Sequence, residues 1–257
     1  MRFVSAMMVL ALLALLPRSR AEEEGVDALI ARLRQDPTDS KAVDAAISRL
    51  GKSSDPRVIP ILRQVLQAAT EKWYRQKLAF TLVLLGDKDD TAYNELARYA
   101  REAITSSAPL WVVYDREGTA IPGRNPEFEA WCQANRLPLQ DCMRQATESV
   151  MDVYMLAVAK DRRSIPLLRQ GLNSANHGIV GMAVRGLAWL NDTDAIPTIA
   201  EVCERLPPKL AVFVANDSAE FDDPRVEPLI LRFIPDEKWR EGIDKRRRER
   251  REKAQKK

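Results

Sequence analysis

The stretch that decides the fold is Ile179-Val-Gly-Met-Ala-Val-Arg-Gly-Leu-Ala-Trp-Leu190, followed closely by Asp192-Thr-Asp-Ala-Ile-Pro197. Apolar residues three and four positions apart in the first part share one face of a helix. In the second part an Asp precedes a Pro by five residues. The Asp carboxylate can accept hydrogen bonds from the free amides that begin a helix, and Pro is tolerated in a first helical turn. The stretch therefore predicts two helices joined by a short aspartate turn.

The same Asp-to-Pro spacing recurs along the chain. The pairs are Asp55 and Pro60, Asp161 and Pro166, Asp192 and Pro197, and Asp223 and Pro228, with a degenerate copy at Asp87. The anchors lie 32 residues apart from 55 to 87, and 31 apart from 161 to 192 and from 192 to 223. A fixed period near 30 residues is the signature of stacked helical repeats. We therefore expect an all-α superhelix, a solenoid of about five helical hairpins, each burying its apolar face against its neighbours.

Two segments carry a family resemblance. Asp161-Arg-Arg-Ser-Ile-Pro-Leu-Leu-Arg-Gln-Gly-Leu172 and Ala183-Val-Arg-Gly-Leu-Ala-Trp-Leu-Asn-Asp192-Thr-Asp-Ala-Ile-Pro197 closely resemble the HEAT repeat, in the short form named after phycobilisome lyases. The resemblance covers roughly residues 25–235, broken by one insertion, and is best over 145–205. It implies a HEAT-like solenoid. Such repeats serve as scaffolds in unrelated systems, so the resemblance implies no particular activity.

The N-terminal segment is typical of a secretory signal. Arg2 precedes the apolar run Val4–Leu16, which is too short to span a bilayer comfortably. Pro17 ends the run, and Ser19-Arg20-Ala21 places small residues where a signal peptidase reads them. We predict cleavage after Ala21 and a periplasmic or secreted protein, with an uncleaved anchor as the alternative. The repeat domain is then expected over residues 22–244.

The repeat is interrupted between Asp87 and Asp161, which lie 74 residues apart. We expect an insertion over about 105–142, with a short β-hairpin from Leu110–Tyr114 and Thr119–Ile121. Asn125-Pro126 is typical of a capped helix start and predicts an additional helix there.

Two groups of residues are candidates for binding a protein or peptide. The aromatic residues of the insertion are either an anchor patch for the partner or the insertion's own small core: Trp111, Tyr114, Phe128 and Trp131. Polar or amphipathic residues of the second helices are expected to line the concave face, where solenoids tend to bind: Arg75, Gln76, Asp152, Tyr154 and Arg185.

The three cysteines allow two interpretations. Cys132 and Cys142 flank a plausible helix-turn-helix, and export would permit a disulfide between them. Alternatively, they are buried free thiols that pack as small apolar groups. Cys203, on a helix with apolar neighbours, is expected to be a packed free thiol.

The C-terminal segment Lys245–Lys257 holds nine Lys or Arg residues and two Glu. This segment carries a net charge of +7, and the three Arg residues of the predicted signal carry +3. The whole chain has a net charge of +3, so residues 22–244 carry a net charge of −7. The tail either binds an anionic membrane surface or cell-wall polyanion, or is a solvated helical extension without a partner. Nucleic acid is not expected, given the export signal and the acidic body. The candidate polyanion-binding residues are Lys245, Arg246, Arg247, Arg248, Arg250 and Arg251.

Catalytic motifs are missing from the sequence. His177 is the single histidine, and it has no Ser or Cys nucleophile with a supporting carboxylate spaced near it. Phosphate loops, nucleophile elbows and metal-binding His pairs are likewise missing. We expect no metal, no cofactor and no enzymatic activity. The leading interpretation is an exported adaptor that binds a protein or peptide through the concave face and the insertion. The alternatives are a surface polyanion binder acting through the tail and a lyase-like, cofactor-handling subunit.

Overall fold

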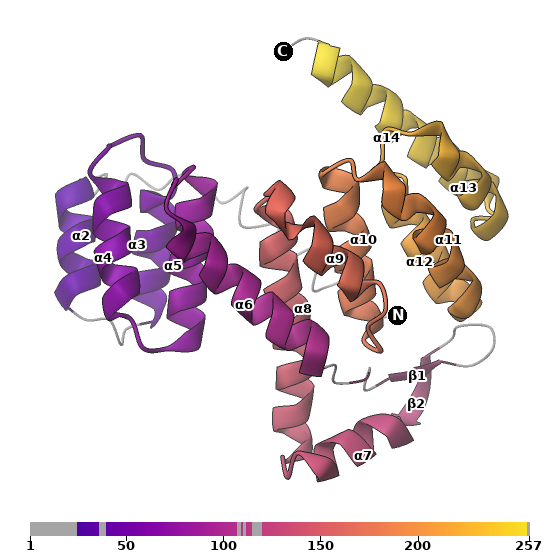
Figure 1. Ribbon diagram of the computed structural model, residues 1–257, viewed down its shortest axis with the longest axis horizontal. Helices are drawn as coiled ribbons and strands as arrows, with labels where there is room; N and C mark the ends of the chain where they lie inside the picture. Colours follow the sequence, from indigo (N-terminus) through magenta and orange to yellow (C-terminus); the bar gives the residue numbers. More distant parts are fainter. Residues whose placement is uncertain (1–24, 36–39, 107–108, 110–111, 115–119, 256–257) are drawn as a thin grey trace. The chain divides into compact units, whose positions relative to one another are not determined.

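The computed structural model describes residues 25–255 apart from 36–39, 107–108, 110–111 and 115–119. Helices dominate these residues, together with one two-stranded antiparallel sheet (Figure 1). The expectation of a helical fold is confirmed in this coarse sense. The chain divides into two compact units, residues 1–65 and 66–257. The predicted signal, residues 1–21, lies outside the described residues, and no helix within them is long and apolar enough to cross a membrane.

The first unit contains α2 (Val26–Gln35), α3 (Ser40–Leu50) and the first part of α4 (Val58–Ala68). The apolar period of the sequence predicts helices over residues 26–35, 41–50 and 57–69, and the observed bounds agree to within about one residue at each end. Ile47 and Leu50, which precede Asp55 by eight and five residues, are fully buried. The apolar stripe of α3 therefore faces the core, as the helical period predicts.

The second unit holds the remaining elements. These are α5 (Lys72–Leu84), α6 (Asp90–Ser106), β1 (Val112–Tyr114), β2 (Ala120–Arg124), α7 (Pro126–Ala134), α8 (Leu139–Val158), α9 (Ile165–Gly171), α10 (His177–Trp189), α11 (Ile196–Arg205), α12 (Pro208–Ser218), α13 (Glu227–Phe233) and α14 (Glu237–Gln255). Helix α10 packs against α8 on one side and α12 on the other, while α9 packs on α10 and α11 on α12. Helices α8 and α10 approach each other closely at Gly186, where an added Cβ would lie 2.7 Å from the Cβ of Ala157.

The aspartate turns behave as the sequence predicts at three positions. At Asp161, Oδ1 accepts a hydrogen bond of 2.9 Å from the backbone amide of Arg163, and the guanidinium of Arg163 returns to both carboxylate oxygens. Asp55 with Arg57 and Asp223 with Arg225 repeat this arrangement. Asp161 and Asp223 each cap a short 3-10 turn, η1 (Arg162–Ser164) and η3 (Pro224–Val226), that leads into the next helix.

The expected cap at Asp192 is wrong. Its carboxylate caps no amide and instead forms two bonds of 2.7 Å with the guanidinium of Arg169. The physical reason is the pair with Arg169, which occupies both carboxylate oxygens of Asp192. Two residues further on, where the turns at Asp55, Asp161 and Asp223 have Arg, this turn has Asp194. With no local guanidinium available, Asp192 pairs with an arginine of the preceding helix α9.

The turn arginine also reaches the hairpin before it. Nη1 of Arg163 lies 2.5 Å from Oδ1 of Asp90, at the start of α6. Its guanidinium carbon lies 3.9 Å from the ring centroid of Tyr93 in the same helix. Within the first unit, Arg57 similarly bonds Asp27 at 3.0 Å. A single arginine thus fixes its own turn and holds that turn against the preceding hairpin.

The insertion has the predicted hairpin and helix. Strands β1 and β2 pair antiparallel, with Val113 opposite Ile121 and Tyr114 opposite Ala120. Helix α7 starts at Pro126, and the side chain of Asn125 accepts from the amide of Glu127 at 3.0 Å. The composition of these few residues was therefore sufficient to locate both elements.

The polar composition of residues 216–222 predicts a loop. This prediction is partly wrong, because α12 continues to Ser218. Asp217 is 9% exposed, and its Oδ1 accepts from Nη2 of Arg185 on α10 at 2.6 Å. A carboxylate is tolerated at a helix interface when a cation pairs with it there. The polarity that suggested a loop belongs instead to an interhelical ion pair.

The basic C-terminal segment is part of a longer helix. Helix α14 spans Glu237–Gln255, so the expected boundary between residues 244 and 245 falls inside it. Its start is fixed by Asp236, whose carboxylate accepts from the amide of Trp239 at 2.9 Å. Ile243 is fully buried, and the indole of Trp239 donates to Asn216 at 3.2 Å. Helix α14 therefore packs on the end of α12.

The aspartate turn can be tested at Asp161. We expect Asp161→Ala to lower the free energy of unfolding by about 1 kcal/mol, because the cap on η1 is lost. The bonded Arg163 lowers the pKa of Asp161, so its contribution is present above the pKa of the unfolded chain and disappears as the pH falls. Urea denaturation measures both effects. Glu201→Ala, in the exposed middle of α11, is the control, and an equal loss there would contradict the assignment.

Candidate partner-binding site

Helices α5 and α8 together form a small hollow. Its volume is about 200 Å³, and its lining consists of Glu71, Lys72, Trp73, Gln76, Glu148, Met151 and Asp152. Lys72 and Gln76 lie four residues apart on one face of α5. Glu148, Met151 and Asp152 have the matching spacing on α8, so each helix presents one continuous row of side chains.

The polar floor of the hollow is organised by Asp152. Its side chain is nearly buried, accepts from Nζ of Lys72 at 3.0 Å, and accepts from the amide nitrogen of Gln76. Burial raises the pKa of Asp152, although the bonds from Lys72 and Gln76 act in the opposite direction. The carboxylate is thus held in place by two donors from α5, and this cluster ties α5 to α8.

The rim of the hollow is apolar. Trp73 and Met151 are each 39% exposed. The Trp73 ring lies 5.5 Å from the ring of the buried Tyr74, so its inner edge is supported by the core. Tryptophan contributes strongly to binding energy at interfaces, and methionine adapts to irregular partners. An apolar rim over a rigid polar floor is the arrangement expected of a peptide contact.

The structure brings together only two of the five residues that were predicted to line the concave face. Gln76 and Asp152 meet in this hollow, whereas Arg75 points elsewhere. Nε of Arg75 lies 2.6 Å from Glu95 on α6, and its Nη1 donates to the carbonyl oxygens of Leu66 and Ala69 at the end of α4. Arg75 therefore closes a helix end and binds α6, which is a structural role.

Arg185 and Tyr154 lie outside the hollow. Arg185 pairs with Asp217, a residue that the sequence did not single out because it was expected in a loop. Asn216, just before it, precedes its anchor Asp223 by seven residues, as Tyr154 and Arg185 precede theirs. This register was the signal that could have placed Asp217 on a second helix. Tyr154 is half-buried on α8.

Two of the four aromatic residues of the insertion, Phe128 and Trp131, belong to a small internal core. Phe128 is buried in a small core with Cys132, Cys142 and Ala146. Trp131 packs against this core and donates from its indole nitrogen to the carbonyl of Ser106 at 3.3 Å. Tyr114 lies on β1, and Trp111 lies outside the described residues. The interpretation of an internal core therefore describes Phe128 and Trp131 better than that of a binding patch.

The three cysteines are free thiols in this structure, and all are buried. Cys132 and Cys142 interact within the core of the insertion, and burial, with this interaction, raises the pKa of Cys132 to about 11. Burial raises the pKa of Cys203 to about 12. Because the thiolate is the reactive form of cysteine, the raised pKa values indicate that Cys132 and Cys203 pack as neutral thiols and are not reactive nucleophiles.

His177 is half-buried at the first position of α10, and burial lowers its pKa. Its Nδ1 has no hydrogen-bond partner among the described residues. The searched part of the chain also holds no group of three His, Cys, Asp or Glu side chains that could bind a metal ion.

The six residues predicted to bind a polyanion all lie on α14 and divide into two sets. Arg247, Arg250 and Arg251 turn back toward the segment between α12 and η3. Lys245, Arg246 and Arg248 are exposed, with Arg246 bonding Asn216 at 3.0 Å.

No protein-family model, curated protein or solved structure matches this chain. The HEAT-like assignment therefore stays a prediction from the residue pattern.

Glu95 provides a test of pH dependence. Burial would raise its pKa, but hydrogen bonds from Arg75, Arg98 and Tyr99 outweigh burial and lower the pKa to about 2 from the usual 4.5. We expect Glu95→Gln to cost about 2 kcal/mol of unfolding free energy near neutral pH. Because the folded-state pKa is depressed, the difference from wild type is complete above pH 4.5 and shrinks as the pH falls toward 2. Denaturation at a series of pH values measures it. Glu102→Gln, on the exposed side of α6, is expected to show little difference.

Asp152 tests whether the hollow is a rigid unit. Asp152→Ala removes the acceptor of Lys72 and leaves the nearly buried amide of Gln76 without this partner. We expect a loss of about 2 kcal/mol in unfolding free energy, since an unsatisfied buried polar group is costly. Glu148→Ala, one turn away on the same helix and exposed, is the matched control. Equal stability of the two variants would show that the Asp152 cluster does not hold α5 to α8.

Proposed function

We propose that this protein is a non-catalytic adaptor, built as a HEAT-like solenoid, that binds a protein or peptide partner at the hollow between α5 and α8. The single observation that carries the proposal is the pair of exposed side chains, Trp73 and Met151, beside the nearly buried and fully anchored Asp152. A preordered floor reduces the entropy lost on binding, and the aromatic rim supplies the contact area.

The charge around the hollow suggests the character of the partner. Glu71, Glu148 and Asp152 outnumber the single cation Lys72. The body over residues 22–244 is likewise acidic, with a net charge of −7. Complementary charge favours the correct partner and speeds its association. We therefore propose a segment with an apolar side chain, which fits against Trp73 and Met151, flanked by a basic residue.

The HEAT-like architecture is supported by two regularities. The Asp-x-Arg turns recur at Asp55, Asp161 and Asp223 with the same hydrogen bonds. The second helices α8, α10 and α12 pack in sequence order. Both are expected of stacked repeats. The N-terminal pattern of the sequence favours a periplasmic or secreted location for the adaptor.

The proposal is tested by placing a photo-crosslinking amino acid at Trp73, and at Glu201 on the exposed face of α11 as a control. We expect one partner to crosslink from position 73 and not from position 201. Its affinity for the purified protein should fall about tenfold or more in Met151→Ala, because this is the loss typical of a residue at the centre of an interface. Glu201→Ala should bind as wild type does.

Two results would contradict the adaptor. One is identical crosslinking from positions 73 and 201, which would indicate non-specific contact. The other is an unchanged affinity in Met151→Ala, which would place the contact elsewhere on the molecule.

A further inference from the structure

Three packed helices of the second unit carry an apolar side chain at the same position. Met151 on α8, Met182 on α10 and Phe213 on α12 each precede the turn aspartate of their own repeat by ten residues. Helix α10 packs between α8 and α12, and Figure 1 shows the three helices in this order. We call these three residues the apolar row.

Contacts between the helices place their equivalent positions side by side. Gly186, six residues before its turn aspartate, approaches Ala157, four residues before its own. Arg185, seven residues before its turn aspartate, bonds Asp217, six residues before its own, at 2.6 Å. Neighbouring helices are therefore in register to within two residues, and the apolar row runs across them.

The apolar row faces solvent. Met151 is 39% exposed and Phe213 is 56% exposed, while Met182 between them is half-buried. The residues three positions later have polar tips and are half-buried, so they border the row on one side: Tyr154, Arg185 and Asn216. Single exposed apolar residues are ordinary, but a contiguous strip with a polar border marks an interaction surface.

The row ends on an aromatic pair. The ring centroids of Phe213 and Trp239 lie 6.5 Å apart in a T-shaped arrangement, and Trp239 is 37% exposed. Oδ1 of Asn216 accepts from the indole nitrogen of Trp239 at 3.2 Å and from Nη2 of Arg246 at 3.0 Å. The side chain of one asparagine thus holds an aromatic ring and a cation together at this end of the row.

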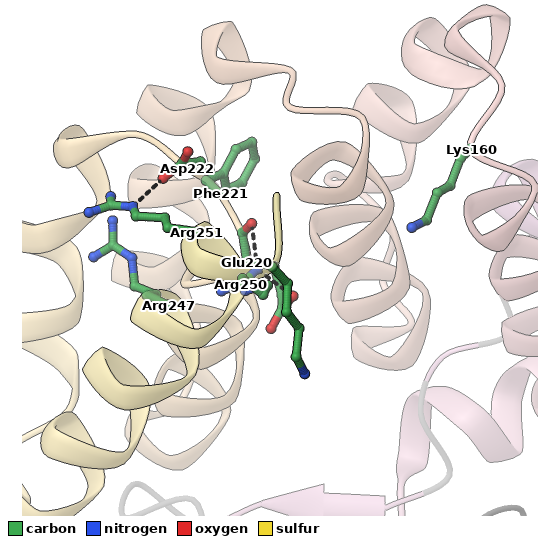
Figure 2. Close-up of a pocket in the computed structure, with 8 residues that line it drawn as sticks. Lys160, Glu220, Phe221, Asp222, Arg247, Arg250 and Arg251 are labelled. Carbon is green, nitrogen blue, oxygen red and sulfur yellow. Dashed lines mark hydrogen bonds and ion pairs between the residues drawn. The ribbon is translucent and has the colours of Figure 1, made fainter. Parts of the chain in front are cut away.

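Helix α14, which carries Trp239 and Arg246, is fixed on the end of α12 by its other arginines. Arg250 donates to the carbonyls of Ala219 and Glu220 at 2.7 and 2.9 Å and to the carboxylate of Glu220 at 2.6 Å. Arg251 bonds Asp222 at 2.7 Å (Figure 2). These side chains border a cavity of about 500 Å³, which is also lined by Lys160, Phe221, Arg247 and Lys253. A surface that is ordered before binding loses less entropy when a partner binds.

The two ends of the row differ in charge. Glu71 and Glu148, which line the α5–α8 hollow beside Met151, are exposed. At the other end, Lys238 and Arg246 are exposed, and Arg246 bonds a neutral amide. Charge complementarity therefore favours one orientation of an elongated partner over the reverse.

The spacing of the row fits a helix better than a strand. Packed helices lie about 8–10 Å apart, which sets the distance between neighbouring members of the row. Seven residues of an α-helix cover about 10 Å and return to the same face. A strand covers that distance in about three residues, so successive contacts would fall on its opposite faces.

We propose that the partner binds as an amphipathic helix laid along the apolar row, from Met151 on α8 to Phe213 and Trp239, with a basic side chain at the α8 end and an acidic one at the α14 end. Three anchors seven residues apart require about 15 residues of partner helix. Methionine and aromatic side chains suit the apolar face of such a helix. This inference rests on the proposed function, since Met151 belongs to both sites, and it adds the conformation, length and direction of the partner.

The test places a benzophenone amino acid at position 151, 182 or 213 of the full chain, and at 231 as the control. Leu231 on α13 is 62% exposed and apolar, but lies outside the row. Mass spectrometry then locates each attachment point on the captured protein. We expect positions 151, 182 and 213 to capture one segment of one protein, with attachment points in that order and about seven residues apart. Position 231 should not capture it.

Four results would overturn the inference. Attachment points about three residues apart would show an extended peptide. Capture from positions 73 and 151 alone would confine the contact to the α5–α8 hollow, and the adaptor proposal would survive. Covalent dimers of this chain would assign the row to self-association, and crosslinks to lipid would assign it to a membrane surface. Capture from none of positions 73, 151, 182 and 213 would overturn both proposals.

A synthetic peptide with the captured sequence tests the energetics. We expect Phe213→Ala to weaken binding about tenfold and Leu231→Ala to leave it unchanged. Reversing the charge in Arg246→Glu should weaken binding, and a peptide whose acidic end residue is changed to lysine should restore it. Unchanged affinity in Phe213→Ala would contradict the inference. Thermal unfolding checks each variant, and Met182→Gln replaces Phe213→Ala if that variant is unfolded.

Discussion

The ion pair between an aspartate and the arginine two residues later is the interaction on which the rest of the structure depends. In Asp161 and Arg163, one carboxylate accepts from a backbone amide that would otherwise have no partner at a helix start, and is held by the guanidinium as well. Because Nη1 of the same arginine reaches Asp90 in the preceding hairpin, the local turn and the packing between hairpins are fixed together. The same holds at Asp55, where Arg57 bonds both its own turn and Asp27.

The same chemistry recurs where no aspartate turn exists. Arg75 donates hydrogen bonds to two backbone carbonyls at the end of α4, and Arg250 donates to two at the end of α12. The last carbonyls of a helix have no partner within that helix, and a guanidinium can satisfy two of them at once. Arg75 and Arg250 therefore bind helix ends rather than presenting their charge to solvent. The net charge of a segment is a poor guide to its exposure when its arginines act in this way.

The two cavities differ in whether their charged side chains are buried and paired or gathered in excess of one sign around an opening. At the α5–α8 hollow, Asp152 is buried and paired with Lys72, while Trp73 and Met151, which line the same hollow, are exposed. Beside α14, cations are gathered around an opening, and two carboxylates neutralise only part of their charge. A buried, paired charge contributes mainly to structure, whereas an excess of one sign around an opening raises the local electrostatic potential.

The positions of the helices could be predicted from the amino-acid sequence, because the signals for helix starts and faces are local. The apolar period, Asn125-Pro126 and the spacing of Asp161 to Pro166 located helix starts within a few residues. Tertiary structure decided which polar residues face solvent. Asp217 looked like part of a loop, and Asp192 like a cap, until arginines on neighbouring helices were found to pair with them. Likewise, the basic run from Lys245 gave no sign of its contacts with residues about 30 positions earlier. Hydrogen bonds within a turn join residues that are adjacent in sequence, so the sequence predicts them. Ion pairs between helices depend on how segments far apart in sequence pack together.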